Sequence, residues 1–235
     1  MQLMAHRGAS GLAPENTLAA FRLALEYQPE WFELDVHATA DGEIVVMHDA
    51  TVDRTTDGTG AIADLKLAGI RRLDAGGWKG EEFAREPVPL LAEVVDLAGG
   101  RVRLNVEIKG GPDLPRTAAR VVDILREGGI LGQSEVSSFD LSAVQAVQAL
   151  TDEPALALIT ARPEDLGTVI EHGFGWLNLH HAGITAELAE RAQAAGVGIC
   201  AWTINDLTRW EEFRELGVAI FCTDMCHLAP PPGKR

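Results

Sequence analysis

The chain has 235 residues, of which 46% are hydrophobic and 23% are charged. This composition is ordinary for a folded globular protein, and the length suits a single α/β barrel of roughly 250 residues. The formal net charge is −15, and such an acidic surface repels nucleic-acid phosphates and anionic lipid heads. We therefore expect no nucleic-acid partner and no stable membrane association, and an anionic small substrate would need a local positive centre.

The cysteine content and the N-terminal residues indicate the compartment. Three cysteines, Cys200, Cys222 and Cys226, make an odd and low count, which argues against a disulfide framework and favours a reducing environment. Cys222, Cys226 and His227 could suggest a metal site, but they do not make a full set of structural zinc ligands, so we expect Cys222 to be a small buried hydrophobe. No long apolar stretch follows the first residues, and we expect a cytoplasmic protein.

Short apolar runs alternate along the chain with segments of helical period. The runs expected to form parallel strands are Leu3–His6, Trp31–Val36, Val102–Ile108, Glu135–Phe139, Ala155–Ile159, Trp176–Leu179, Val197–Thr203 and Val218–Cys222. Eight strands with helices between them predict a closed (β/α)₈ TIM-type barrel, formed as one domain over residues 1–235. The competing fold is an open doubly wound sheet, but no glycine-rich dinucleotide fingerprint supports it.

A ninth apolar run, Glu43–His48, follows the second strand directly after the turn signal Asp41-Gly42. The connection is too short for a parallel crossover, so the run is predicted to pair antiparallel as an arm beyond the barrel. From there to a helix predicted at Leu90–Leu97, the chain is rich in glycine and aspartate. We expect this small insertion after strand two, about residues 48–89, to cap the barrel mouth.

Acidic side chains gather where adjacent strands end, which is the face of such a barrel that carries chemistry. Glu33 and Asp35 are two residues apart on one strand and therefore share a face, and Glu107 lies on the next parallel strand. Three converging carboxylates favour a hard divalent cation, either Mg²⁺ or Ca²⁺. The alternative is a structural network in which these carboxylates pair with Lys109 or Arg7.

Two histidines accompany these carboxylates at strand ends. His6 ends the first strand and His48 ends the arm. Imidazole both gives and accepts protons near neutral pH, so we interpret the two residues as a catalytic acid–base pair, although a lone histidine is more often a packed or surface residue. Arg7 offers a planar fork for phosphate oxygens and Lys109 a point charge; for Arg7 the alternative is an ordinary salt bridge.

Weaker candidates lie near the same strand ends. Trp202 is either a platform for the carbon skeleton of a small polyol or a core aromatic residue. Asn16 lies in the segment that opens the first helix, and His180 follows the sixth strand. For each of them, contact with the substrate and a local structural role are equal alternatives. Asp49 and Arg54 lie in the insertion, where solvated turn residues are the default interpretation.

The ordered set of motifs resembles the glycerophosphodiester phosphodiesterase family. The matching pieces are His6-Arg7-Gly8, Pro14-Glu15-Asn16-Thr17, Glu33-Leu34-Asp35-Val36, Asp41-Gly42 leading to His48-Asp49, Glu107-Ile108-Lys109, Ser138-Phe139 and Trp202-Thr203-Ile204-Asn205. They span nearly the whole chain in the family's order. The sequence departs from the family after Thr223-Asp224, where Met225-Cys226-His227 replaces the usual aromatic residue, proline and aspartate.

The resemblance implies a TIM-type barrel with a small insertion after strand two. It also implies a divalent ion held by Glu33, Asp35 and Glu107, with His6 and His48 as acid and base. Arg7 and Lys109 would contact the phosphate. These roles together predict metal-dependent hydrolysis of glycerophosphodiesters, such as glycerophosphocholine, to sn-glycerol 3-phosphate and an alcohol.

Three other functions fit parts of the pattern. A phospholipase-type phosphodiesterase would share the site but act on intact lipid, and the net charge of −15 disfavours its approach to a membrane. A sugar-phosphate isomerase would need neither three converging carboxylates nor a metal. A non-catalytic phosphate-binding barrel would not need both histidines and the complete carboxylate set.

Overall fold

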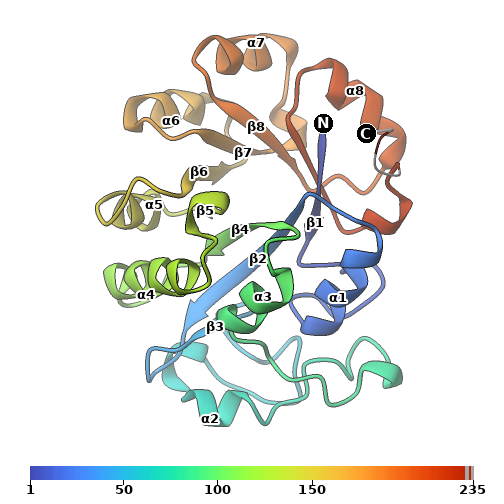
Figure 1. Ribbon diagram of the computed structural model, residues 1–235, viewed down its shortest axis with the longest axis vertical. Coiled ribbons are helices and arrows are strands. Elements are labelled where there is room, and N and C mark those ends of the chain that lie inside the picture. Colours follow the sequence, from blue (N-terminus) through green and yellow to red (C-terminus); the bar gives the residue numbers. More distant parts are fainter. Residues whose placement is uncertain (231–232, 234–235) are drawn as a thin grey trace.

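The computed structural model describes residues 1–230 and 233, and within them a nine-stranded sheet forms the centre of the protein. The strands are β1 (Gln2–His6), β2 (Trp31–Ala38), β3 (Ile44–Val46), β4 (Arg103–Ile108), β5 (Glu135–Ser138), β6 (Ala155–Thr160), β7 (Trp176–His180), β8 (Gly198–Trp202) and β9 (Ile220–Thr223). They follow the order β1-β9-β8-β7-β6-β5-β4-β2-β3, and β1 also pairs with β2. Without β3, eight parallel strands close on themselves, which confirms the TIM-type barrel (Figure 1).

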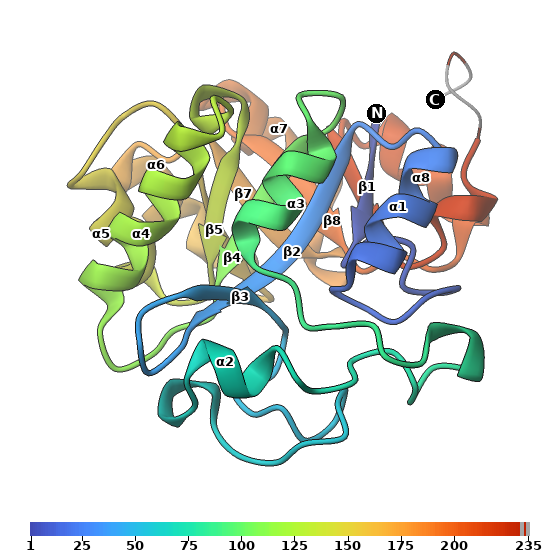
Figure 2. The same cartoon turned by 60° about the horizontal axis from the view of Figure 1, so that its bottom comes forward.

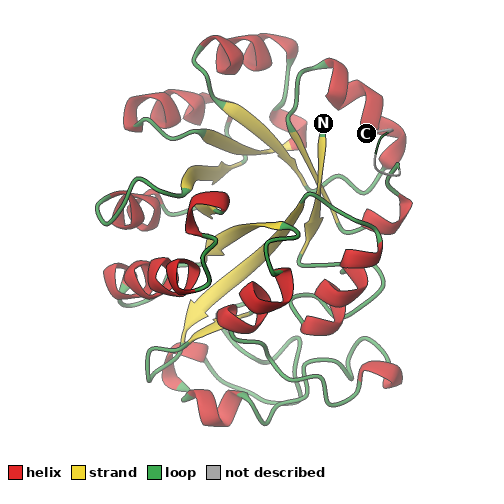
Figure 3. Ribbon diagram, viewed as in Figure 1, coloured by secondary structure: helices red, strands yellow, loops and turns green. Residues whose placement is uncertain are grey.

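Helices surround the barrel, and the coils outside the strands are visible in Figure 3. They are α1 (Leu18–Glu26), α3 (Leu91–Ala98), α4 (Leu114–Glu127), α5 (Leu141–Gln148), α6 (Leu166–His172), α7 (Ala186–Ala194) and α8 (Trp210–Glu215). The short helix α2 (Leu67–Ile70) lies instead in the segment between β3 and α3. Several begin at a residue whose side chain accepts a hydrogen bond from the first turn, such as Thr17 for α1 and Asp113 for α4. Such caps stabilise a helix by about 1 kcal/mol each.

Strand β2 shows how the sequence separates the hydrophobic core from the chemistry. Phe32, Leu34 and Val36 belong to the main hydrophobic cluster between the sheet and the helices. Burying such side chains stabilises the fold by about 1.5–3 kcal/mol each. Because successive strand residues face opposite sides, Glu33 and Asp35 face the barrel interior. The packing of the outer layer therefore fixes the direction of the two carboxylates.

The antiparallel arm predicted after strand two is confirmed. Strand β3 pairs antiparallel with β2, and Val36 lies opposite Val46. Gly42 takes a left-handed backbone with φ of +86° in the intervening turn, which glycine adopts without steric cost. The segment between β3 and α3 has a small hydrophobic cluster of its own, which includes Val52 and Ile62. Figure 2 shows this segment along the end of the barrel toward which β2 points.

The barrel interior below this end contains a polar cluster. Asn105 and Asn178 both donate to one carboxyl oxygen of Glu135, at 2.7 and 2.8 Å. Ser137 donates to the amide oxygen of Asn105 at 2.6 Å. Burial raises the pKa of Glu135 to about 7. The inward face of this parallel sheet is therefore partly polar even at depth.

The three cysteines are buried, and Cys200 and Cys222 are free thiols. Cys222 belongs to a small apolar cluster that also contains Cys200 and Met4, which confirms its prediction as a buried hydrophobe. Among the described residues, no helix combines the length and apolar character needed to cross a bilayer.

Candidate active site

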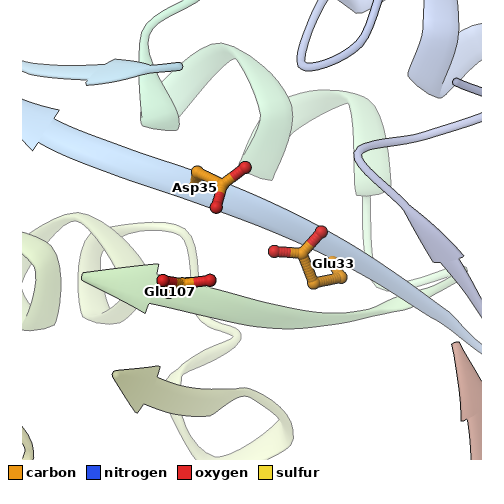
Figure 4. A group of neighbouring side chains, drawn as sticks. All are labelled: Glu33, Asp35 and Glu107. Carbon is orange, nitrogen blue, oxygen red and sulfur yellow. The ribbon is translucent and has the colours of Figure 1, made fainter. Parts of the chain in front are cut away.

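Three buried carboxylates meet at the end of the barrel. Glu33 and Asp35 come from β2 and Glu107 from β4, and one oxygen of each lies within 4.8 Å of the others. The parallel register places Asp35 directly opposite Glu107, so the pairing of the strands brings the side chains together. Figure 4 shows the three carboxylates on these neighbouring strands. The convergence expected from the sequence is thus present.

Crowding of these carboxylates perturbs their protonation. Burial, together with the charge of Asp35, raises the pKa of Glu33 well above its usual value and that of Glu107 to about 7. Burial alone would also raise the pKa of Asp35, but Arg7 and Lys109 outweigh it and lower that pKa to about 2. Further positive charge is therefore needed for all three groups to ionise together.

Two cations already lie against the carboxylates. Lys109 Nζ is 2.7 Å from Glu107 Oε1 and 3.3 Å from Asp35 Oδ1. Arg7 Nε is 3.1 Å from Asp35 Oδ2, and its Nη1 donates to Glu15 Oε1 at 2.9 Å. The ion-pair network considered as the alternative is thus formed, and it holds both cations at the edge of the carboxylate cluster.

The backbone at Arg7 is left-handed, with φ of +57°. This conformation costs a non-glycine residue about 1 kcal/mol or more. The Arg7 N–H donates to the carboxylate and to the carbonyl oxygen of Glu33, each at 3.0 Å. The strained turn therefore ties the end of β1 to a carboxylate of β2.

His6 is oriented by Asp224. Its Nδ1 lies 2.6 Å from Asp224 Oδ1, and its Nε2 is 3.8 Å from Glu33 Oε2. Because an ionised carboxylate only accepts, Nδ1 carries the proton and Nε2 faces the carboxylate cluster. Ser10 and Asn205 also donate to Asp224, at 3.0 and 2.7 Å. Asp224 is therefore a fixed acceptor that sets the ring orientation.

His48 has a matching partner in Asp49. Its Nδ1 lies 2.7 Å from Asp49 Oδ1. Arg54 donates to both carboxylate oxygens of Asp49, at 2.7 and 3.0 Å, and to both oxygens of Glu15, at 3.0 and 2.8 Å. Burial lowers the pKa of His48, although Asp35 and Asp49 act in the opposite direction. A continuous set of ion pairs thus joins the insertion to the barrel.

A cavity of about 130 Å³, called here the mouth cavity, brings most of the predicted residues together. Its polar wall consists of His6, Arg7, Glu33, His48, Glu107 and Lys109. Trp202 and Phe139 form an aromatic wall, with their rings edge to face and their centroids 5.5 Å apart. The cavity thus has a charged side for an anion and an aromatic side for carbon atoms.

Two predicted substrate contacts do not line the mouth cavity. Asn16 is buried and donates to Asp35 Oδ2 at 2.7 Å, so it positions a carboxylate instead. The ring of His180 stacks on His181 and meets the edge of Trp202 at 5.2 Å between centroids. Because its position at the end of β7 turns it toward these rings, His180 supports the aromatic wall from behind.

Several residues of the site were not identified from the sequence. Asp224 had no assigned role although it directly follows the last strand, and Asp49 and Arg54 were interpreted as solvated turn residues. The adjacency of Asp49 to His48 was an available signal. The bridge from Arg54 to Glu15 depends on how the insertion folds, and residues 39 positions apart offer no local pattern for it.

Comparisons with known proteins agree with this geometry. The sequence profile of the glycerophosphoryl diester phosphodiesterase family matches residues 6–228. A glycerophosphodiester phosphodiesterase of Caldanaerobacter subterraneus is 36% identical over 230 residues, which cover 94% of this chain and 93% of that protein.

Solved structures give the same result. A phosphodiesterase of Oleispira antarctica, in complex with the product sn-glycerol-3-phosphate, superposes with a TM-score of 0.88 at 32% identity and covers 96% of this chain and 93% of its own. A glycerophosphodiester phosphodiesterase of Agrobacterium tumefaciens superposes with a TM-score of 0.85 at 30% identity, and the match covers 97% of this chain and 100% of that one. Profile, relatives and structures thus agree, and the chain belongs to the glycerophosphoryl diester phosphodiesterase family.

Proposed function

We propose that this protein is a glycerophosphodiester phosphodiesterase that hydrolyses glycerophosphodiesters to sn-glycerol 3-phosphate and a free alcohol. The observation that carries the proposal is the mouth cavity, in which two histidines, two cations and a carboxylate cluster face one space. Membership of the family supports the same reaction. The relative crystallised with sn-glycerol-3-phosphate supports a small, water-soluble substrate.

We propose that Glu33, Asp35 and Glu107 hold a divalent metal ion, Mg²⁺ or Ca²⁺. Carboxylate oxygens are the ligands that both ions prefer. One oxygen of each carboxylate lies within 4.8 Å of the others. Burial and the charge of Asp35 raise the pKa of Glu107 to about 7, so a divalent cation would favour ionisation of the whole cluster. A bound ion would supply Lewis-acid stabilisation of charge on phosphate and hydroxyl oxygens.

The chain's own residues bind and orient the phosphodiester. Arg7 offers N–H donors in a planar fork, and Lys109 an ammonium group, on the same side of the mouth cavity. Both would offset the negative charge that develops on the phosphoryl oxygens. Trp202 and Phe139 would pack against the glycerol carbons. The substrate would thus lie between a charged wall and an aromatic wall.

His6 and His48 would move the protons. One takes the proton of the glycerol 2-hydroxyl as that oxygen attacks phosphorus, and the other protonates the leaving alcohol. The resulting cyclic phosphate is then opened by water, with the two proton transfers reversed. Each imidazole has a carboxylate on Nδ1, Asp224 for His6 and Asp49 for His48, so Nε2 is the nitrogen that acts in both.

We further propose that residues 48–89 cap the barrel mouth within a single domain. Arg54 supports this because it joins the insertion to Glu15 of the barrel. The free, buried thiols of Cys200 and Cys222 support a reducing compartment, and we propose a cytoplasmic location. The net charge of −15 favours a soluble diester over an intact lipid in an anionic membrane.

The decisive test is turnover of a glycerophosphodiester by wild type, His6→Ala and His48→Ala, each supplied with Mg²⁺ or Ca²⁺. Wild type should release sn-glycerol 3-phosphate, and each variant should lose roughly 10²–10⁴-fold in kcat. Circular dichroism and metal titration show whether the variants remain folded and loaded. Folded, loaded variants with wild-type turnover would refute the acid–base assignment, and an inactive wild type would refute the function.

A further inference from the structure

A second and larger opening lies beside the mouth cavity. This cleft of about 370 Å³, called here the head-group cleft, is bounded by the β2–β3 hairpin, by the first part of the insertion and by the loop from β4 to α4. Lys109 lines both the cleft and the mouth cavity. The two spaces therefore adjoin at the side chain that the proposed function places on the phosphate.

We propose that the head-group cleft binds the alcohol part of the substrate and selects uncharged polyols, such as inositol or glycerol, over choline and ethanolamine. The inference rests on the proposed function. The mouth cavity of about 130 Å³ suits only a small moiety such as glycerol against Trp202 and Phe139. A phosphate held at Lys109 then directs its second ester oxygen toward the larger space, whose volume is within the usual range for ligand sites.

The composition of the cleft walls favours a bulky but neutral group. Five alanines leave the centre of the cleft open: Ala38, Ala40, Ala50, Ala61 and Ala63. Its described lining contains the imidazole of His37 but no tryptophan, tyrosine or phenylalanine, and it is the faces of those three side chains that hold quaternary ammonium ligands. The aromatic side chains of the site, Trp202 and Phe139, line the mouth cavity instead. A choline group would therefore gain little in this cleft.

The charges in the cleft also favour a neutral head group over a cationic one. Lys109 and Arg116 contribute two cations, and Asp113 is the acidic residue of the described lining. The Asp113 carboxylate accepts from the backbone N–H of Arg116 at the start of α4, at 3.2 Å, so its charge is partly offset by the helix N-terminus. A cationic head group thus meets net repulsion, while the guanidinium and the hydroxyl of Thr117 can bond to hydroxyl groups.

The Arg116 side chain lies beside the β2–β3 turn. Its guanidinium lies over Gly42, where a Cβ atom would come within 2.8 Å of Nη2. Across the cleft, Gly110 and Gly111 have positive φ values of +81° and +150°, and a Cβ atom on either would meet nothing within 4 Å. The cleft is thus open at its rim, while the exposed Arg116 guanidinium lies close to Gly42 on the opposite hairpin.

The test compares kcat/KM on three diesters: glycerophosphoinositol, glycerophosphocholine and sn-glycero-3-phosphomethanol, whose methyl group does not occupy the cleft. Wild type should prefer the inositol ester to the choline ester by about tenfold or more. Ala63→Trp, which fills the cleft, should lower kcat/KM on the inositol ester by about tenfold and leave the methyl ester within about twofold. Ala68→Trp, at an exposed alanine of α2 outside the cleft, is the matched control and should change neither.

Arg116→Gln should narrow the preference for inositol over choline, because it removes the repelling cation and its donor fork. Ala40→Trp on the hairpin is a second cleft-filling variant if Ala63→Trp fails to fold. Equal losses on the inositol and methyl esters, or equal wild-type turnover of inositol and choline esters, would overturn the inference while leaving the proposed function intact. Absence of turnover on all three diesters would instead overturn both.

Discussion

The Nδ1 atom of His6 lies 2.6 Å from a carboxylate oxygen of Asp224, although the two residues are 218 positions apart in the chain. The contact joins the ends of β1 and β9, which are neighbours in the barrel. It directs Nε2 of His6 toward the carboxylate cluster, since Nδ1 must donate. Asp224 therefore fixes the orientation of the ring to which the proposed function assigns a proton transfer. It lies in the loop where the sequence departs from the usual family pattern.

Asp224→Asn should lower kcat roughly 10²-fold and change KM by less than about threefold, because the neutral amide no longer fixes the ring tautomer. Steady-state kinetics on a glycerophosphodiester measure both parameters. Asp152→Asn, at an exposed aspartate, is the control and should behave as wild type. A wild-type kcat in folded Asp224→Asn would contradict the positioning role.

Asp49→Asn should shift the pH dependence. Burial lowers the pKa of His48, and the hydrogen bond from His48 to Asp49 raises it. The substitution removes a negative charge that stabilises the protonated ring. The lowering of the pKa by burial is then opposed less strongly, so the pKa of His48 falls further. The limb of the kcat/KM profile that reports His48 should move to lower pH, and an NMR titration of the ring should move with it. A shift to higher pH would show that Asp49 does not stabilise the charged imidazole.

Metal binding should stabilise wild type and fail to stabilise Glu107→Gln. A ligand present at about 100 times its dissociation constant adds about 2.7 kcal/mol to the free energy of unfolding. This corresponds to a rise in Tm of roughly 5–10 °C for a chain of this size. Thermal unfolding with Mg²⁺ or Ca²⁺, and again in excess chelator, measures the effect. Glu190→Gln, at an exposed glutamate of α7, should keep the full rise. An equal rise in Tm in Glu107→Gln and in Glu190→Gln would show that the ion binds elsewhere.

Arg54→Ala should loosen the insertion without unfolding the protein. Arg54 bridges Asp49 and Glu15, but its side chain is 46% exposed, so the loss of stability should be on the order of 1 kcal/mol or less. Hydrogen exchange of the amides at residues 48–60 should become faster and KM should rise. Arg54→Lys keeps the charge but not the fork, and it should recover only part of the protection.

Glu135→Gln should stabilise the protein at alkaline pH. The pKa of Glu135 in the folded protein is about 7, raised by burial from an ordinary 4.5. The unfolded chain ionises this group more readily, so wild-type stability falls as the pH rises through this interval, by at most about 3 kcal/mol. Glutamine keeps the oxygen that accepts from Asn105 and Asn178 and cannot ionise. Urea unfolding should give a variant close to wild type at pH 5 and more stable at pH 8.

The order of the strands and the polarity of their two faces could be predicted from the sequence. On β2, Leu34 between Glu33 and Asp35 determines which side chains face the interior. The ends of the strands differ from the predicted ends by one or two residues. Strand β9, for example, begins at Ile220 and not at the predicted Val218. Such ends depend on the pairing of neighbouring strands, which a single run of residues does not reveal.

The supporting contacts of the site were less accessible from the sequence. Asn16 positions Asp35 through a backbone at Asn16 with φ of +59°, and nothing in the residues around it distinguishes this role from helix capping. Asp224, Glu15 and Arg54 find their partners only after the barrel has closed and the insertion has docked. Local patterns therefore predicted which charged groups and histidines gather at the barrel mouth, while the groups that hold them required the tertiary structure.

The small hydrophobic cluster that includes Val52 and Ile62 supports one wall of the head-group cleft. Val52, Ile62 and Ile70 pack in that cluster, apart from the main core between the sheet and the helices. Ala61 and Ala63 alternate with Ile62 along this stretch and line the head-group cleft. The wall of the proposed cleft therefore rests on a different hydrophobic cluster from the one that packs behind Glu33 and Asp35, and a substitution at Ala61 or Ala63 would change the cleft at a distance from the main core.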